Sequence, residues 1–151
     1  MDNIDKEIVL LLQEDAKMNV KKIAEKLNIT ISPVYDRIKR LEENGVIDKY
    51  VAITNEKLFG NAMFVFCSVS LEVQKLSEIE KFKSEIMKIP EVMECYLMGG
   101  VNDFLLKVRV KDLSDYHKFS SGKLAALNNV SQIKSSFVLD VVKREFRSNT
   151  F

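Results

Sequence analysis

The sequence is poor in the residues that build metal centres and disulfide frameworks. It has two cysteines, one histidine and no tryptophan, and Cys67 and Cys95 form no C-x-x-C or His-bearing cluster. No metal site is therefore indicated. Both cysteines lie in apolar, strand-like runs, which predicts buried free thiols; a redox or metal role is the alternative.

Long apolar runs are absent as well. No run approaches the roughly 20 residues that span a bilayer, and Met1-Asp2-Asn3 is acidic where a signal peptide is basic. We therefore expect a cytoplasmic protein with no membrane partner. With 151 residues, 46% of them hydrophobic and 30% charged, the chain is long enough for one ordinary domain or two small ones with packed cores.

An excess of charge of one sign is also lacking, but the charges are unevenly distributed. The formal net charge is +1, which taken alone argues against a nucleic-acid partner. Between residues 17 and 40, however, seven basic residues stand against two acidic ones. A solvated helix surface would explain this equally well, so charge alone leaves both interpretations open.

Two short amphipathic helices joined by a tight turn are predicted within residues 20–47. Apolar residues recur there at helical spacing, at Val20, Ile23, Ala24, Leu27, Val34, Ile38 and Leu41. The turn falls at residues 28–30, and Gly45 ends the second helix. The outer face of that helix is polar and basic, as in a helix presented to the major groove. An opening helix over residues 3–14 is expected to pack under the pair, and residues 47–53 are a candidate wing.

From residue 62 the apolar period changes from helical to alternating. We predict strands at about 62–73, 92–98, 104–110 and 133–142, with helices at about 77–89 and 114–127. Strand–helix–strand twice over is the split βαβ arrangement. The fold class is therefore α+β, with an N-terminal winged helix-turn-helix domain (1–54), a linker (55–61) and a C-terminal ferredoxin-like βαββαβ domain (62–151).

One face of the predicted sheet indicates self-association. The helices cover one face, and Phe64 and Phe66 point to the other, which is too apolar to leave in water. Burial against a second copy is the simplest solution. We expect at least a homodimer.

The motifs of the common enzyme classes are missing. The sequence contains no G-x-S-x-G elbow and no Walker loop, and His117, the only histidine, is expected at an exposed helix position. A ferredoxin-like half also suggests a small-molecule enzyme or a metal-binding chaperone, but neither has a nucleophile, base or ligand set here. We predict no catalytic residue, no metal and no required cofactor.

Three segments together carry a specific pattern. Residues 4–16 read IDKEIVLLLQEDA, Ile29–Ile47 reads ITISPVYDRIKRLEENGVI, and Gly100–Lys107, which follows Glu94–Leu97, reads GVNDFLLK. They are similar to D-x-x-I-L-x-x-L-x-x-D, to L-S-x-x-x-V-x-x-R-[IV]-x-R-L-E-x-x-G-[VI]-I and to G-x-x-D-[YF]-L-L-K. In this combination, and over nearly its whole length, the chain resembles the Lrp/AsnC (leucine-responsive, feast/famine) family.

The resemblance implies a transcriptional regulator that binds specific double-stranded DNA. It implies a winged helix-turn-helix domain joined to a ligand-sensing, RAM-type βαββαβ domain. It also implies dimers that assemble further into tetramers, octamers or hexadecamers, with an amino-acid effector bound between the sensing domains of neighbouring subunits. The alternative is a nucleoid-type architectural DNA-binding protein without a small-molecule effector.

The resemblance assigns DNA contacts to the helix pair. These residues are Lys21, Lys22, Thr30, Ser32, Pro33, Tyr35, Asp36, Arg37, Lys39 and Arg40. Lys39 and Arg40 have the reach for phosphates or guanine edges. Arg37 has two interpretations, a backbone contact or an internal ion pair, and Thr30 and Ser32 are alternatively helix caps.

The resemblance assigns effector contacts to the sensing half. These residues are Leu97, Gly100, Val101, Asn102, Asp103, Leu113, Ser136, Phe137 and Val138. Gly100 allows close backbone approach and Asp103 suits an ammonium group, although both residues alternatively serve only the turn. The last strand begins with Ile133 where a threonine is usual in the family, which leaves the ligand open.

Overall fold

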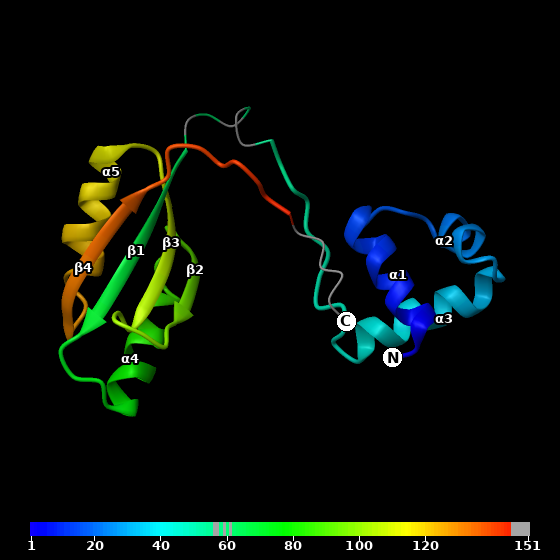
Figure 1. Ribbon diagram of the computed structural model, residues 1–151, viewed down its shortest axis with the longest axis horizontal. Helices are drawn as coiled ribbons and strands as arrows, with labels where there is room; N and C mark the ends of the chain where they lie inside the picture. The colour runs from blue at the N-terminus through cyan, green and yellow to red at the C-terminus, as the bar shows by residue number, and fades with distance from the viewer. Residues whose placement is uncertain (56–57, 59, 61, 146–151) are drawn as a thin grey trace. The chain divides into compact units, whose positions relative to one another are not determined.

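The computed structural model describes residues 1–55, 58, 60 and 62–145. They form two compact units, drawn in Figure 1. The helical unit is built on Met1–Thr54, with which the described residues from Val142 are grouped, and the sheet unit is Asn55–Val141. The expected linker, 55–61, includes residues 56, 57, 59 and 61, which lie outside the described residues.

The helical unit contains α1 (Asn3–Glu14), α2 (Val20–Leu27) and α3 (Ile31–Glu43). Two of these helices begin at a side-chain cap, because the first N–H groups of a helix have no partner within it. The Asp2 carboxylate accepts from the Asp5 N–H at 2.8 Å, and the Asp5 carboxylate accepts from the Asp2 N–H at 3.1 Å. Asn19 caps α2 by accepting from the Lys22 N–H at 2.8 Å. Aspartate and asparagine are among the residue types most favoured at this position.

One small core holds the three helices together. Its buried members recur at helical spacing along all three helices and the loop before α2, and they are Ile8, Val9, Met18, Ile23, Ala24, Val34 and Leu41. The turn between α2 and α3 passes through Asn28, whose φ of 54° is left-handed, and Gly45, at φ 67°, follows the end of α3. Both positions match the predicted helix-turn-helix boundaries.

Two details of the helical unit differ from the sequence prediction. Ser32, for which a helix cap was one interpretation, lies within α3, and Thr30 occupies the N-cap position without a side-chain cap hydrogen bond. Pro33 is thus the third helical residue, where its missing N–H costs no helical hydrogen bond. Residues 47–53 form no strand, and no strand occurs within residues 1–55. This segment is instead anchored by Tyr50, whose hydroxyl donates to Glu42 Oε1 at 2.8 Å.

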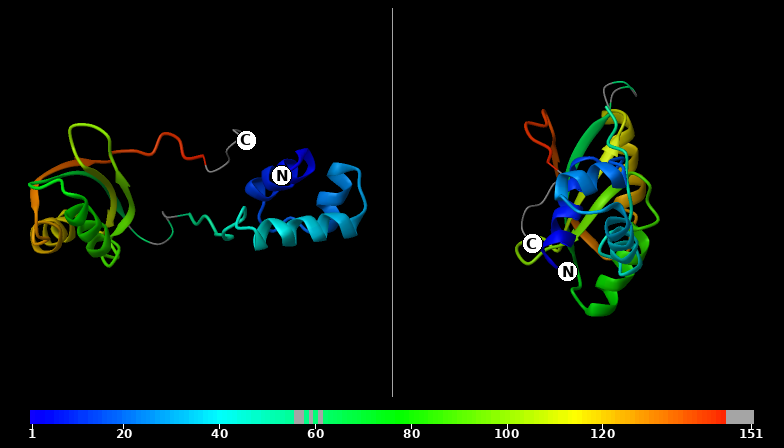
Figure 2. Two further views of the ribbon diagram at one scale, coloured as in Figure 1. Left: turned by 90° about the horizontal axis from the view of Figure 1, so that it is seen from below. Right: turned by 90° about the vertical axis from the view of Figure 1, so that its right-hand side faces the viewer.

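The sheet unit is a four-stranded antiparallel sheet with the order β2-β3-β1-β4. Its strands are β1 (Met63–Leu71), β2 (Val92–Leu97), β3 (Phe104–Val110) and β4 (Val130–Phe137), and its helices are α4 (Leu76–Ile86), α5 (Leu113–His117) and the π-helical η2 (Lys118–Leu124). Figure 2 shows α4 and α5 on the same face of the sheet. This is the predicted split βαβ topology.

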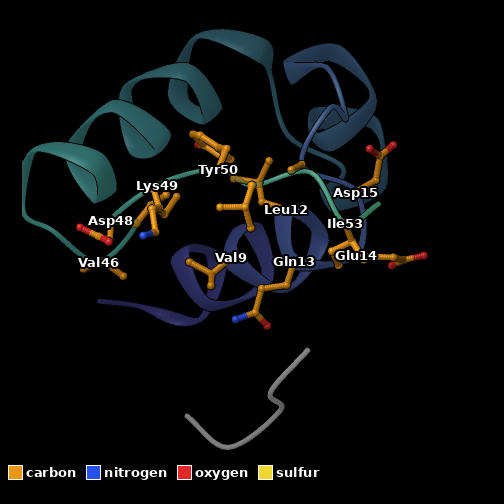
Figure 3. Close-up of a pocket in the computed structure, with 13 residues that line it drawn as sticks. Val9, Leu12, Gln13, Glu14, Asp15, Val46, Asp48, Lys49, Tyr50 and Ile53 are labelled. Atoms are coloured by element: carbon orange, nitrogen blue, oxygen red, sulfur yellow. The ribbon is translucent and has the colours of Figure 1, made fainter. Parts of the chain in front are cut away.

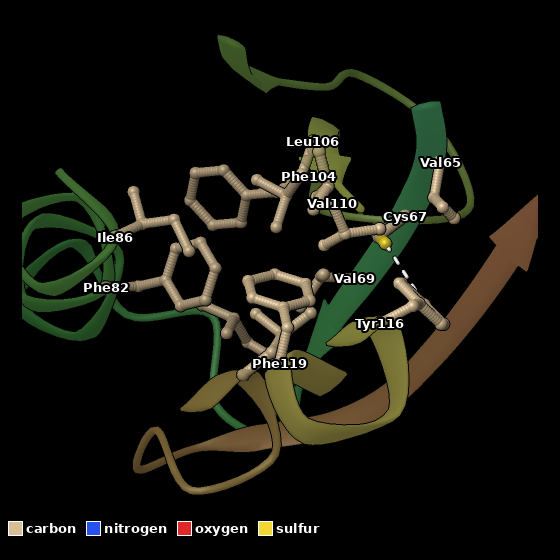
Figure 4. Close-up of a cluster of buried hydrophobic side chains, with 13 residues drawn as sticks. Val65, Cys67, Val69, Phe82, Ile86, Phe104, Leu106, Val110, Tyr116 and Phe119 are labelled. Atoms are coloured by element: carbon tan, nitrogen blue, oxygen red, sulfur yellow. Dashed lines mark hydrogen bonds between the residues drawn. The ribbon is translucent and has the colours of Figure 1, made fainter. Parts of the chain in front are cut away.

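Alternate residues of β1 and β3 build the core under the helices. Val65, Cys67 and Val69 of β1 are fully buried, as are Leu106 and Val108 of β3. They meet Phe82 of α4 and Phe119 of η2, as Figure 4 shows. The Cys67 Sγ lies 3.4 Å from the Tyr116 hydroxyl, and burial raises the pKa of the Cys67 thiol. Cys67 is therefore the buried thiol that the sequence predicts.

Three boundaries or environments in the sheet unit differ from the prediction. The helix expected over 114–127 changes to a π-helix at Lys118, and the strand expected over 133–142 runs from Val130 to Phe137. Cys95, expected to be buried, is exposed. The reason is its place on β2, which lies at an edge of the sheet and pairs only with β3.

Within the described residues, no helix is long and apolar enough to cross a membrane.

Candidate nucleic-acid interface and effector-binding residues

The outer face of α3 gathers most of the predicted DNA-binding residues. Val34 and Leu41 are buried, so the opposite side of the helix faces solvent. Exposed on α3 are Ser32, Pro33, Tyr35, Asp36, Lys39 and Arg40. Tyr35 is 60% exposed and offers a partner the apolar surface of its ring. Lys21 and Lys22 of α2 are exposed too, as is Thr30, which directly precedes α3.

Arg37 is the exception, because an acidic pair from α1 holds its guanidinium. Arg37 Nη1 donates to Asp2 Oδ2 and to Asp5 Oδ1, both at 2.6 Å. The side chain of Asp5 is only 4% exposed and that of Arg37 is 23% exposed. Of the two interpretations of Arg37, the internal ion pair is the one that the structure contains.

Arg40 shares the same carboxylate but remains accessible. Its Nη2 lies 3.2 Å from both oxygens of Asp5, whereas the Arg40 side chain is 55% exposed. Because solvent reaches the guanidinium of this pair, its attraction to Asp5 is screened and weak. Arg40 can therefore exchange Asp5 for a phosphate, and Arg37 would remain to neutralise Asp5.

The acidic pair is ionised at neutral pH. The Asp5 N–H and then Arg37 hydrogen-bond to Asp2 and lower its pKa. Burial by itself would raise the pKa of Asp5, but the hydrogen bonds from Arg37 and from the Asp2 N–H outweigh burial, so the pKa lies below its ordinary value. The same contacts raise the pKa of Arg37. An internal ion pair was one interpretation of Arg37 from the sequence, but its partners Asp2 and Asp5, more than 30 positions away, could not be found there.

The other basic side chains near α3 make only weak contacts. Lys39 Nζ lies 3.8 Å from Glu43 Oε1, and both side chains are more than half exposed. Such a pair contributes little to stability, so the ammonium group is available to an anion.

Below α3, the helical unit has a cavity of about 430 Å³ between α1 and residues 46–53, shown in Figure 3. None of the predicted DNA-binding residues lines it.

The predicted effector residues fall into two groups at opposite ends of β1. Leu97 pairs with Phe104, and the Asp103 N–H donates to the Val69 carbonyl at 3.0 Å. At the other end, the Val138 N–H donates to the Phe64 carbonyl at 3.0 Å. A strand rises ~3.3 Å per residue, so these points lie roughly 16 Å apart. One small ligand cannot touch both groups within one protomer.

The first group contains Leu97, Gly100, Val101, Asn102 and Asp103, and much of its polar chemistry is occupied. Asp103 Oδ2 accepts from the Leu71 N–H at 2.7 Å, so this carboxylate closes the turn, which is the second of its two interpretations. Val101 is 90% exposed and Leu97 54%. Their apolar side chains are thus free to meet a ligand or another copy.

The second group contains Leu113, Ser136, Phe137 and Val138, near the start of α5 and the end of β4. The rings of Phe137 and Tyr116 meet edge to face with centroids 5.1 Å apart. Phe137 is still 41% exposed, and Leu113 is 64% exposed. This end of the sheet therefore also offers apolar surface to a partner. Among the described residues, no group of His, Cys, Asp and Glu side chains could hold a metal ion.

Comparisons with known proteins agree on both halves of the chain. A winged helix-turn-helix DNA-binding model matches residues 1–48, and an Lrp/AsnC ligand-binding-domain model matches residues 64–148. A Bkd operon transcriptional regulator of Pseudomonas aeruginosa is 37% identical over 142 residues, which are 94% of this chain and 93% of that protein. The leucine-responsive regulatory protein of Escherichia coli K12 is 31% identical over 147 residues, 97% of this chain and 90% of that protein.

Solved structures agree with the fold. An AsnC-family transcriptional regulator from Agrobacterium tumefaciens is 30% identical with a TM-score of 0.89, over 97% of this chain and 95% of that one. A transcriptional regulator of Neisseria meningitidis, determined as a complex with L-Met, is 27% identical with a TM-score of 0.90. That comparison covers 98% of this chain and 96% of the other.

Proposed function

Because this chain belongs to the Lrp/AsnC family of transcriptional regulators, we propose that α3 lies in the major groove of a specific operator and that an amino acid tunes the binding. The observation that carries the proposal is the exposed polar face of α3 opposite Val34 and Leu41. A helix anchored on one side and polar on the other is the form that reads base edges. The proposed activity is regulatory, with no chemical step.

The proposed DNA contacts divide into two kinds. Lys21, Lys22, Lys39 and Arg40 would contact phosphates, which sets affinity and orientation. Ser32 and Tyr35, near the start of α3, would contact base edges. Asp36 would repel phosphate and must lie over the groove floor, where cytosine can donate to it. Arg37 is proposed as a positioning residue, since Asp2 and Asp5 occupy its guanidinium.

The proposed effector site lies between copies of the chain. The two groups of effector residues are separated along β1, so a ligand that touches both must take one group from each of two neighbouring subunits. The L-Met complex of the Neisseria meningitidis regulator supports an amino acid as the ligand class. Apolar surface at Val101, Leu113 and Phe137 favours an amino acid with an apolar side chain.

Assembly is proposed to begin with the sheet face that α4 and α5 leave bare. Phe66 lies on this face between Lys107 of β3 and Ser136 of β4. Packing this face against its copy would form a homodimer, and contacts at the two ends of β1 would join dimers into larger assemblies. We place the DNA-binding domain at residues 1–54 and the sensing domain at 62–151. An operator on the chromosome implies that the protein works in the cytoplasm.

The test is a comparison of affinities at fixed salt. Genomic fragments retained by the full chain are sequenced, and the best fragment is measured against random duplex by fluorescence anisotropy. A specific regulator is expected to bind its operator ~10³-fold more tightly or better. A ratio near one would instead indicate an architectural protein. Repeating the measurement with each of the twenty amino acids tests the effector, and no change with any of them would contradict it.

A further inference from the structure

The sheet unit contains a second candidate site, apart from the effector residues proposed above. A cavity of about 610 Å³ lies among the start of β2, the end of β3 and the helices α5 and η2. None of the predicted effector residues lines it. We propose that this cavity binds a small carboxylic acid with an apolar body and a hydrogen-bond donor on the carbon next to its carboxylate.

The first observation is an unused donor. Arg109 Nε is buried and has no hydrogen-bond partner in the part of the chain that the structure describes. An unpartnered buried N–H is costly, and a guanidinium group is suited to a carboxylate. Lys111, two residues further along the chain, is exposed and lines the same cavity. The two cations therefore offer a place for one negative charge.

The second observation is an unused acceptor beside that donor. Glu91 Oε2 is also buried and without a partner among the described residues. Its other oxygen, Oε1, accepts from Lys123 Nζ, and this hydrogen bond lowers the pKa of Glu91, so the carboxylate is charged at neutral pH. The backbones of the two residues are joined, because the Arg109 N–H donates to the Glu91 carbonyl at 2.8 Å. A free acceptor and a free donor thus start from adjacent points.

Much of the remaining wall of the cavity is apolar, and the rest is formed by Asp115, Lys118 and Lys123. Met93, Val110 and Phe119 line it together with Pro90 and Ala62. Phe119 and Val110 are buried, whereas Met93 is 56% exposed and lies where a ligand could cover it. Lys118 and Asp115 pair with each other at 3.2 Å. The lining therefore offers a ligand a cationic corner, one free carboxylate oxygen and a hydrophobic surface. A ligand that fits all three has a carboxylate, an adjacent ammonium or hydroxyl group, and an aliphatic chain.

Two families of compounds share that chemistry, and a third provides the negative control. L-leucine offers an ammonium group to Glu91 and L-2-hydroxyisocaproate offers a hydroxyl group. 2-Oxoisocaproate has the same carbon skeleton but no donor at that carbon. 2-Oxoisocaproate would leave the Glu91 oxygen without a donor, which disfavours its binding. Its half-saturating concentration is therefore expected to be at least about tenfold higher than that of L-leucine or L-2-hydroxyisocaproate.

Methionine-methyl NMR on the full chain separates this site from the proposed effector site. Met93 lines the cavity. Met98 lies instead beside the predicted effector residues, because the Met98 N–H donates to the Asp103 carbonyl at 2.8 Å. Titration with L-leucine or L-2-hydroxyisocaproate is expected to shift the Met93 methyl resonance saturably. If neither compound shifts it, the cavity proposal is wrong, whatever happens at Met98. A shift at Met93 without one at Met98 supports the cavity and counts against the effector loop.

Arg109→Lys is the decisive variant, since it keeps the charge but loses the Nε donor. It is expected to raise the half-saturating concentration at Met93 at least about tenfold, and Lys111→Gln to raise it about threefold. Lys88→Gln, at an exposed lysine outside the cavity, is the matched control and should change nothing. Unchanged saturation in both cavity variants would overturn the proposal. Lys111→Gln decides alone if Arg109→Lys does not fold.

Discussion

The Arg37 guanidinium and the Asp5 carboxylate lie 2.6 Å apart and join α3 to α1 across 32 positions of sequence. Asp5 also belongs to the capping box that starts α1. One carboxylate thus fixes the start of the first helix and the orientation of the helix proposed to read DNA. Arg40, on the same carboxylate, is the more exposed of the two arginines. The pair therefore links the stability of the helical unit to its binding surface.

Asp5→Asn is expected to destabilise the helical unit. Asparagine can still accept from the Asp2 N–H, but it removes the charge that holds Arg37 and Arg40. Hydrogen bonds to charged groups contribute about 2 kcal/mol, so the free energy of unfolding should fall by about that amount. Urea unfolding followed by helical circular dichroism measures it. Glu7→Gln, at an exposed position on α1, should change it by less than about 0.5 kcal/mol, and equal effects in the two variants would contradict this role.

The stability of the helical unit is expected to fall in acid. The pKa of Asp5 is lowered from its ordinary value of 3.8 in the folded chain, so the unfolded chain binds a proton first as the pH falls. The stabilisation is therefore complete above the unfolded pKa and is lost as the pH falls through the folded pKa. Thermal unfolding between neutral pH and about pH 2 tests this. The difference between the natural chain and Asp5→Asn should shrink below about pH 4; a constant difference would argue against it.

Arg40→Ala is expected to weaken binding to every DNA sequence. If Arg40 contacts one phosphate, the slope of log affinity against log salt becomes less steep by about 0.9. Fluorescence anisotropy at several salt concentrations, on operator and random duplex, measures the slope. Lys88→Gln, in the sheet unit, is the control. An unchanged slope would mean that Arg40 stays with Asp5 when the protein binds.

Tyr35→Ala is expected to act on specificity instead. Tyr35 is 60% exposed on the proposed reading face, and a mismatch at one base pair of a specific site typically costs ~1–3 kcal/mol. Affinity for the operator should fall about tenfold or more, while affinity for random duplex stays the same and serves as the internal control. A parallel loss on both duplexes would make Tyr35 a non-specific contact.

Phe66→Lys is expected to break the proposed dimer. The substitution puts a second lysine beside Lys107, its cross-strand neighbour on the bare sheet face, and burying two ammonium groups there is unfavourable. Light scattering coupled to gel filtration should report a smaller particle than for the natural chain. Met87→Lys, 85% exposed at the end of α4, should leave the mass unchanged. An unaltered assembly in Phe66→Lys would place the interface elsewhere.

Much of the fold could be predicted because it depends on neighbours in the chain. Asp2 and Asn19 begin helices and Asn28 makes a left-handed turn within short stretches of sequence. The alternation of β1 and β3 likewise identifies one buried face. Errors arose where a distant element decided the environment. Cys95 resembles a buried strand residue in the sequence, but its strand lies at an edge of the sheet.

The sequence by itself determined the helix-turn-helix, the split βαβ order and the exposed polar face of α3, since periodicity and capping are local properties. Only the tertiary structure decided that Arg37 pairs with Asp2 and Asp5. It also decided that the predicted effector residues separate to the two ends of β1. Those results depend on side chains more than 30 positions apart and on strand register, which a pattern along the chain does not encode.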